Sequence, residues 1–138
     1  MSDGSMKNNM NDLEQFCSDW LASWTGNHPE KLRGFYTENA VYRDPAKPNG
    51  LMGPELLPYF KRLLQLNPNW TWHVQEILPT ASGFCLKWRA EIPVGEKMIH
   101  ETGLDIVEIE NRKICRNEVF FDRVTLLDAM QAKSGITL

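Results

Sequence analysis

The sequence lacks the features that would tie the protein to a membrane or to a nucleic acid. No run approaches the roughly 18 consecutive apolar residues of a membrane-spanning helix, and the N-terminus has no apolar signal-peptide core. The formal net charge is -3 and the pI is near 5.6, whereas nucleic-acid binders usually present a basic face. We therefore expect neither a membrane nor a nucleic acid as partner.

Cysteine and the usual metal-binding spacings are also scarce. Cys17, Cys85 and Cys115 are scattered, and an odd number of cysteines without a signal peptide is typical of reduced thiols in the cytoplasm. Because HxH, HxxxH and CxxC spacings are absent, we expect no metal site. The roles of His73 and His100 stay open.

Nothing in the sequence divides the chain, since it has no internal repeat and no low-complexity tract. A length of 138 residues with 42% hydrophobic residues is enough for one domain with a proper core. The polar beginning of the chain predicts a disordered tail over residues 1–11. The domain is expected over 12–132 and a second loose tail over 133–138.

The first half of the chain indicates helices with one strand between them. Asp12 is the expected cap of a helix whose apolar residues recur every three or four positions: Leu13, Phe16, Cys17, Trp20, Leu21 and Trp24. Pro29 suits the first turn of a short second helix. A strand over 40–45, a loop over 46–53 and a third helix are expected to follow.

Alternating residues in the second half predict four strands, over 70–78, 84–92, 98–109 and 113–122. Asn111 tolerates a positive φ and suits a tight turn between the last two strands. A short helix over 124–130 ends the pattern. The order αα-β-α-ββββ predicts an α+β cone, in which a strongly curved antiparallel sheet wraps the N-terminal helices and leaves a cavity.

Both faces of the last hairpin carry apolar residues. One face should line the cavity, and the other carries Leu104, Ile106, Ile114 and Phe120. A hairpin that is apolar on both sides needs a cover in so small a protein. We therefore expect a homodimer that forms through the sheet.

Two aspartates are candidates for chemistry. Asp105 stands among apolar residues on the cavity-facing side of its strand, where a carboxylate is costly to bury unless it is paired, protonated or used. Asp44 ends the first strand. Two carboxylates facing an apolar cavity can run acid–base chemistry beside a carbonyl. The alternatives are that Asp44 only caps a turn and that Asp105 pairs with Arg43 or Arg89.

The segments YTENAVYRDP over residues 36–45 and GLDIVEI over 103–109, continuing to Phe121 and Asp122, resemble the nuclear transport factor 2-like superfamily. The similarity is to its SnoaL-like polyketide cyclase and ketosteroid isomerase-like branches, and it covers about residues 12–130. The resemblance implies the cone fold and a pocket for a small hydrophobic molecule, with no cofactor. The superfamily includes isomerases, cyclases, hydrolases, dehydratases and non-catalytic carriers, so the fold does not name the chemistry.

The resemblance also assigns roles to single residues. Asp44 falls where ketosteroid isomerases keep the general base, and Asp105 falls where they keep a protonated, hydrogen-bond-donating acid. Trp20 stands near the place of the isomerase's oxyanion-hole tyrosine, and Tyr42 is the expected substitute. Gly103 stands where epoxide hydrolases need an arginine, which argues against epoxide hydrolysis.

Substrate-binding residues follow from the same resemblance, which places Asn117, Val119 and Phe121 on the cavity side of the last strand. Trp20 and Trp88 are expected to line the mouth of a pocket for a flat ligand. SnoaL-type cyclases keep an acid/base near Val119, but Glu118 is expected to face the opposite side.

We therefore expect a pocket protein that performs cofactor-independent proton transfer, isomerase- or cyclase-like, on a hydrophobic carbonyl substrate. Two alternatives stay open. One is a non-catalytic carrier whose aspartates only orient a ligand, and the other is a dimerising interaction module whose cavity is plugged by tryptophan and phenylalanine. The sequence does not decide whether the protein is an enzyme.

Overall fold

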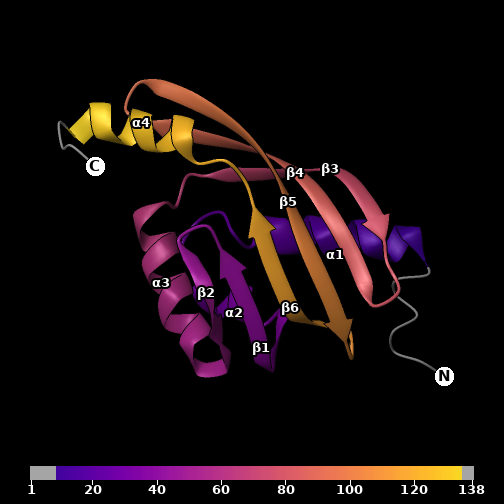
Figure 1. The fold of residues 1–138 in the computed structure, drawn as a ribbon. Helices are drawn as coiled ribbons and strands as arrows, with labels where there is room; N and C mark the ends of the chain where they lie inside the picture. Colours follow the sequence, from indigo (N-terminus) through magenta and orange to yellow (C-terminus); the bar gives the residue numbers. More distant parts are fainter. Residues whose placement is uncertain (1–8, 135–138) are drawn as a thin grey trace.

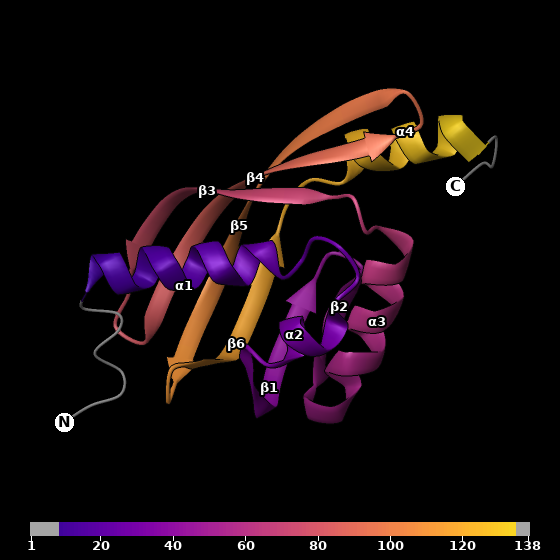
Figure 2. The same ribbon diagram turned by 180° about the vertical axis from the view of Figure 1, so that it is seen from behind.

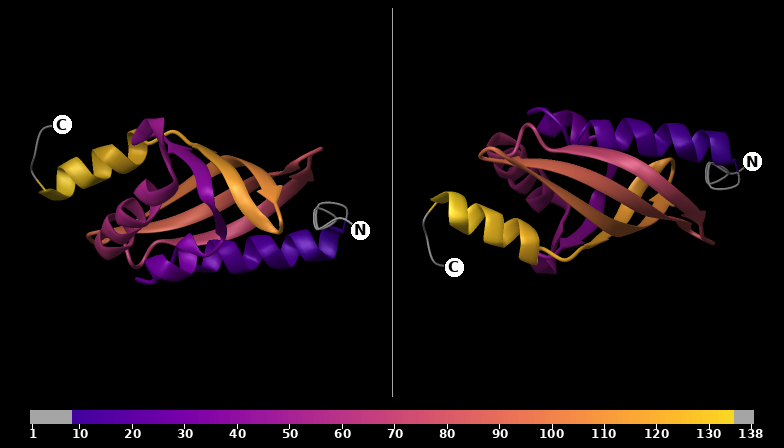
Figure 3. Two further views of the ribbon diagram at one scale, coloured as in Figure 1. Left: turned by 90° about the horizontal axis from the view of Figure 1, so that it is seen from below. Right: turned by 90° about the horizontal axis from the view of Figure 1, so that it is seen from above.

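Six strands form one curved sheet that does not close, and helices pack against its concave side (Figures 1 and 3). The computed structural model describes residues 9–134. The elements are α1 (Met10–Ala22), α2 (Pro29–Arg33), β1 (Tyr36–Asp44), β2 (Lys47–Met52), the 3-10 turn η2 (Gly53–Glu55), α3 (Leu56–Leu66), β3 (Thr71–Pro79), β4 (Gly83–Val94), β5 (Lys97–Glu110), β6 (Lys113–Phe120) and α4 (Val124–Ser134). The predicted α+β cone is confirmed.

Helix α1 crosses the concave face of the sheet (Figure 2). Its apolar stripe is buried as predicted, with Leu13 and Cys17 fully enclosed. The predicted cap is wrong. Asn9 caps the helix, because its side-chain oxygen accepts from the backbone N–H groups of Asn11 and Asp12. The helix therefore begins at Met10, inside the stretch that was predicted to be a tail.

The predicted loop over 46–53 is mostly a strand. Strand β2 pairs antiparallel with β1, so that Tyr42 lies opposite Leu51, and it forms one edge of the sheet. In the sequence, Pro48 and Gly50 indicated a loop. In the structure Gly50 has a φ of 86°. An edge strand accommodates both, because one side of its backbone needs no ladder partner.

The sheet is also not the purely antiparallel meander that the sequence predicted. Its strand order is β2-β1-β6-β5-β4-β3, and β1 runs parallel to β6, with Tyr42 opposite Asn117. This pairing places the end of β1 beside the last hairpin. Asp44 and Asp105, far apart in the sequence, thereby reach the same region of the molecule.

The hairpin of β5 and β6 closes as predicted but contains a bulge. Its turn has φ values of 53° at Asn111 and 64° at Arg112, as a tight two-residue turn requires. Ile109 lies opposite Ile114, whereas Glu108 already lies opposite Arg116, so one residue of β6 is extra. The bulge turns Ile114 into the core, where it is fully buried, and its predicted place on the outer face is wrong.

The ends of the domain differ slightly from the prediction. Helix α4 continues to Ser134, past the predicted boundary at residue 132. Residues 1–8 and 135–138, which the two predicted tails include, lie outside the described residues. Among the residues described, no helix is both long and apolar enough to cross a membrane. The cytoplasmic location stays a prediction.

Candidate functional site

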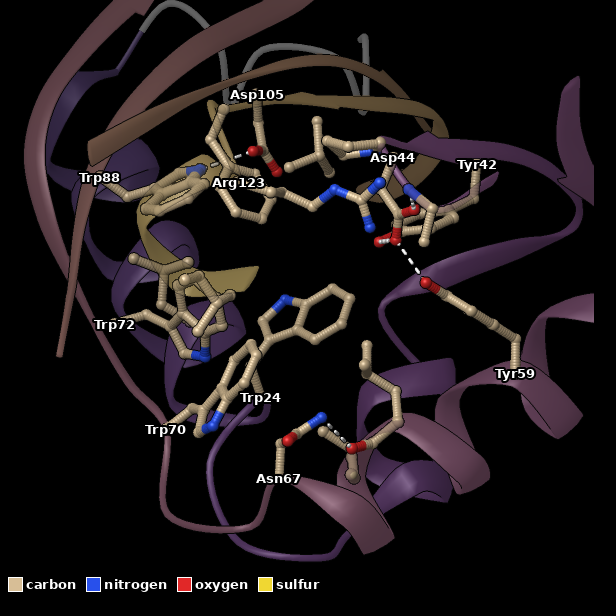
Figure 4. A pocket seen from close by; sticks show the side chains of 18 of the residues that line it. Trp24, Tyr42, Asp44, Tyr59, Asn67, Trp70, Trp72, Trp88, Asp105 and Arg123 are labelled. Carbon is tan, nitrogen blue, oxygen red and sulfur yellow. Dashed lines mark hydrogen bonds between the residues drawn. The ribbon is translucent and has the colours of Figure 1, made fainter. Parts of the chain in front are cut away.

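A cavity of about 230 Å³ lies between the concave face of the sheet and helices α3 and α4 (Figure 4). Its wall is largely aromatic and aliphatic. Four tryptophans line it. Three are in contact, with ring centroids 6.1 Å apart for Trp70 and Trp72 and 5.0 Å for Trp72 and Trp88, and the fourth, Trp24, packs on Tyr42 and Phe60. An apolar wall with a few polar groups is typical of small-molecule sites.

Asp105 is a polar group buried in that wall. The residue is only 4% exposed, yet it lines the cavity. Trp88 Nε1 donates to Oδ1 at 2.7 Å, and Asn117 Nδ2 donates to Oδ2 at 3.0 Å. Burial raises the pKa of Asp105 from its ordinary 3.8 to about 7, the two hydrogen bonds oppose this change, and the charge of Asp44 adds to it. Near neutral pH this carboxyl can therefore both release and accept a proton.

Asn117 orients the Asp105 carboxyl through a hydrogen bond inside the protein core. It is fully buried, and its Oδ1 accepts a hydrogen bond of 2.9 Å from the Tyr36 hydroxyl. Because that bond fixes which end of the amide points to Asp105, the amide N–H always faces the carboxyl. Asn117 thus contacts Asp105 and does not line the cavity. It was predicted to bind substrate, but in the structure it orients the Asp105 carboxyl.

Gly103 explains how Trp88 reaches Asp105. The two residues Gly103 and Trp88 lie opposite each other on β5 and β4. A Cβ on Gly103 would lie 2.1 Å from Trp88 Cζ2, so the indole lies directly over the glycine backbone. The absence of a side chain at 103 therefore makes room for the ring whose N–H bonds to Asp105.

Asp44 occupies the other side of the cavity with all its acceptor positions engaged. Its Oδ2 accepts from the hydroxyls of Tyr42 at 2.7 Å and Tyr59 at 2.6 Å. Its Oδ1 accepts from the backbone N–H groups of Ala46 at 2.8 Å and Lys47 at 2.9 Å. The last two bonds are the turn-capping interaction that was the alternative reading of this residue.

Tyr42 and Tyr59 remain protonated next to Asp44. Burial raises the pKa of both hydroxyls well above the ordinary range, and the Asp44 charge raises them further. Both protons are held in the bonds to Asp44. The three residues therefore form a fixed polar group at the cavity wall, built from β1 and α3.

The structure places the other predicted residues as follows. Trp88, Val119 and Phe121 line the cavity. Trp20 does not line it. This residue is fully buried between Phe16, Tyr36 and Phe84, with ring centroids 6.4–6.5 Å away, so its predicted place at the mouth of the pocket is wrong. Trp20 packs into the core between α1 and the sheet, whereas its neighbours Leu21 and Trp24 line the cavity.

Neither histidine considered in the sequence belongs to the site. His73 lies on the exposed face of the sheet and contacts Glu91 at 2.9 Å, and His100 is exposed. Over residues 9–134, no group of three or more His, Cys, Asp or Glu side chains is arranged to hold a metal ion.

Arg123 is the main residue that the sequence reasoning missed. It lies between β6 and α4, lines the cavity, and extends across it toward Asp44 (Figure 4). The alternation that placed Asn117, Val119 and Phe121 inward reaches Arg123 when it is continued by one step. Tyr59 was missed as well, although it lies on the buried stripe of α3.

The sequence matches a known protein family, and the fold matches known structures. The family model described as the SnoaL-like domain matches residues 18–117. A search of curated proteins finds no match. Among solved structures, a protein described as a SnoaL-like polyketide cyclase from Shewanella putrefaciens superposes with a TM-score of 0.74 at 13% identity, covering 93% of each chain.

Two further structures resemble the chain. A Catenulispora acidiphila protein with a ketosteroid isomerase-like fold, in complex with trimethylamine, has a TM-score of 0.71 at 15% identity and covers 89% of this chain and 94% of its own. The protein TerC, co-crystallised with polyporic acid, has a TM-score of 0.72 at 10% identity and covers 86% and 98%. At these identities the likeness shows the fold alone. Since the family model matches most of the chain, the protein belongs to the SnoaL-like domain family of the nuclear transport factor 2-like superfamily.

Proposed function

We propose that this protein catalyses cofactor-independent proton transfer on a hydrophobic, carbonyl-bearing small molecule, in an isomerase- or cyclase-like reaction. The observation that carries the proposal is Asp105, a buried carboxyl with a pKa of about 7 at the wall of an apolar cavity. Such a group has the balance of acid and base forms that proton transfer near neutral pH requires. The small-molecule complexes of two relatives are consistent with a ligand in this cavity.

In this proposal the ionised Asp105 takes a proton from the carbon next to the carbonyl and later returns it to another atom of the same molecule. Trp88 and Asn117 each donate one hydrogen bond to the carboxylate, so one lone pair of each oxygen is left for the substrate. Both donors hold the carboxyl in one orientation. The proton that leaves the substrate is thus carried without any cofactor.

The division of roles between the two aspartates changes relative to the expectation from the sequence. Asp44 was expected to be the base, but its four hydrogen bonds favour a structural and electrostatic role. A base needs a free lone pair, and Asp105 keeps one facing the cavity. We therefore assign the proton transfer to Asp105 and the support of this wall to Asp44 with Tyr42 and Tyr59.

Deuterium exchange tests this proposal. The probe is 2-tetralone, an uncharged bicyclic ketone whose protons next to the carbonyl exchange with D₂O and are followed by proton NMR. Wild-type protein is expected to accelerate the exchange over buffer, and Asp105→Asn to abolish the acceleration. Asp128→Asn, at an exposed aspartate of α4, is the matched control. Exchange at the buffer rate, together with low-pH titration of Asp105 in carboxyl-carbon NMR, would favour the carrier alternative.

We also propose that two copies of the chain pair through the outer face of the sheet. Leu104 and Phe120 lie opposite each other on β5 and β6 and are 36% and 50% exposed, and Ile106 is the next outward residue on β5. Exposed apolar side chains clustered on one sheet face are typical of an interface. The inward turn of Ile114 removes one of the four residues on which this expectation was based.

A further inference from the structure

The cavity wall has few charged groups, and they differ in how many hydrogen-bond partners the protein gives them. Asp44, Asp105 and Arg123 are the charged residues that line it, so Arg123 is its single cation among the described residues. Both aspartates are held by donors of the protein, Asp44 by four and Asp105 by two. A cation in such a wall is expected to have a carboxylate partner as well.

Arg123 has no such partner. Within residues 9–134 its guanidinium takes part in no ion pair and in no side-chain hydrogen bond, although its side chain extends toward Asp44. Figure 4 shows the Arg123 side chain extending from the Asp105 side of the cavity to the neighbourhood of Asp44. Its five N–H donors are therefore free to bind a ligand.

The acceptors nearest to Arg123 do not compete strongly for it. The charge of Asp44 is already shared with two tyrosine hydroxyls and two backbone N–H groups. Asp105 is partly neutral near pH 7, since burial raises its pKa to about 7. A negatively charged oxygen of a ligand would thus meet a guanidinium that forms no ion pair with another described residue.

The remaining wall defines the rest of the ligand. The four tryptophans and Phe121 present ring faces and edges to the cavity, with Trp88 and Phe121 5.5 Å apart. Such walls bind flat rings by stacking and by edge contacts. A cationic ligand would also suit aromatic faces, but both aspartates already accept hydrogen bonds from the protein, whereas the donors of Arg123 are free for an anion.

We propose that the ligand of this cavity is a planar, hydrophobic ring compound with an anionic oxygen, a carboxylate or an ionised enol, and that Arg123 binds this oxygen. The inference rests on the proposed function, because it names the substrate class of the same cavity. It places the anionic oxygen of the substrate between the two aspartates, within the region where Asp105 moves the proton. Arg123 is then the residue that selects acids over their neutral analogues.

A pair of probes that differ only in charge tests the assignment. Isothermal titration calorimetry compares 2-naphthoate with its neutral analogue 2-naphthamide on the full chain. Charge-assisted hydrogen bonds are about twice as strong as neutral ones, so wild-type protein should prefer the naphthoate. Arg123→Gln should weaken naphthoate binding at least tenfold and change naphthamide binding less than about twofold. Arg123→Lys should keep part of the preference, because it keeps the charge.

Arg89→Gln is the matched control. Arg89 is exposed on β4, opposite His73 of β3, and its substitution removes the same charge from the molecule without touching the cavity wall. Its affinity for 2-naphthoate should equal that of the wild type. The inference is overturned if Arg123→Gln leaves naphthoate binding unchanged, if it weakens both probes equally, or if wild-type protein binds no naphthoate at about 1 mM. The exchange test uses uncharged 2-tetralone, so its outcome does not depend on any of these results. Failure of the proposed ligand class can therefore be told apart from failure of the proposed proton transfer.

Discussion

Replacing Asp105 by asparagine should change how the stability of the protein depends on pH. The amide keeps the shape of the carboxyl but does not titrate. In the wild type the pKa of Asp105 is about 7 in the folded chain, against an ordinary 3.8, because burial disfavours the charged form. The folded state therefore binds the Asp105 proton more tightly than the unfolded state does.

The sign and size of the effect follow from proton linkage. A carboxyl whose pKa is raised on folding contributes stability that is fully present below pH 3.8 and is lost as the pH rises through 7. Each pH unit in this interval is worth about 1.4 kcal/mol, so the full change is about 4 kcal/mol. Between pH 4.5 and 8.5, about 3 kcal/mol of it is accessible. Relative to the wild type, Asp105→Asn should become more stable by this amount as the pH rises.

Urea unfolding followed by tryptophan fluorescence measures the effect. The free energies of unfolding of wild type and Asp105→Asn are compared at pH 4.5, 6.5 and 8.5, since the contributions of all other groups cancel in the difference. Asp128→Asn, at an exposed position away from the cavity wall, is the control. If the difference for Asp105→Asn does not vary with pH, the carboxyl titrates alike in the folded and unfolded chains, and the reasoning from burial is refuted.

Four further predictions concern other parts of the molecule. Gly103→Ala should lower the free energy of unfolding by about 1–3 kcal/mol in urea titrations, because its Cβ would collide with the Trp88 indole. With no arginine at 103, the wild type should not hydrolyse cyclic epoxides, and turnover of cyclohexene oxide would contradict this. Ile106→Asp should split the proposed dimer in sedimentation velocity, whereas a wild type that is monomeric at every concentration would refute the dimer. Asn9→Ala should cost about 1 kcal/mol of stability, and Asp12→Ala clearly less, since Asn9 is the cap.

Local patterns predicted much of the fold. The apolar stripe of α1 and the alternation along β4, β5 and β6 gave the correct elements, because burial of one face enforces a period that is visible in the chain. The same alternation correctly turned Asp105 toward the cavity. Asn111 correctly marked the tight turn, since it tolerates a positive φ.

Features that depend on distant partners were not predictable in this way. Strand β2 contains Pro48 and Gly50, and only its pairing with β1 makes it a strand. The bulge that buries Ile114 arises from the register of β6 between two neighbours, and the parallel pairing of β1 with β6 has no local signature. The places of Trp20 and Arg123 relative to the cavity were not predictable for a related reason. Which residues line the cavity depends on where α1 ends and where α4 packs, and the residue pattern within a single segment does not show this.

The parallel pairing of β1 with β6 also has a consequence for how the chain folds. Tyr42 and Asn117 are neighbours across this seam but lie 75 positions apart in the chain, so a long loop must close before they meet. The β3–β4–β5–β6 meander can form from local hairpins, whereas β1 and β2 can join the sheet only after β6 exists. Asp44 and Asp105 lie on opposite sides of the seam. Binding competence should therefore appear only in the slowest refolding phase, after most of the secondary structure is already present.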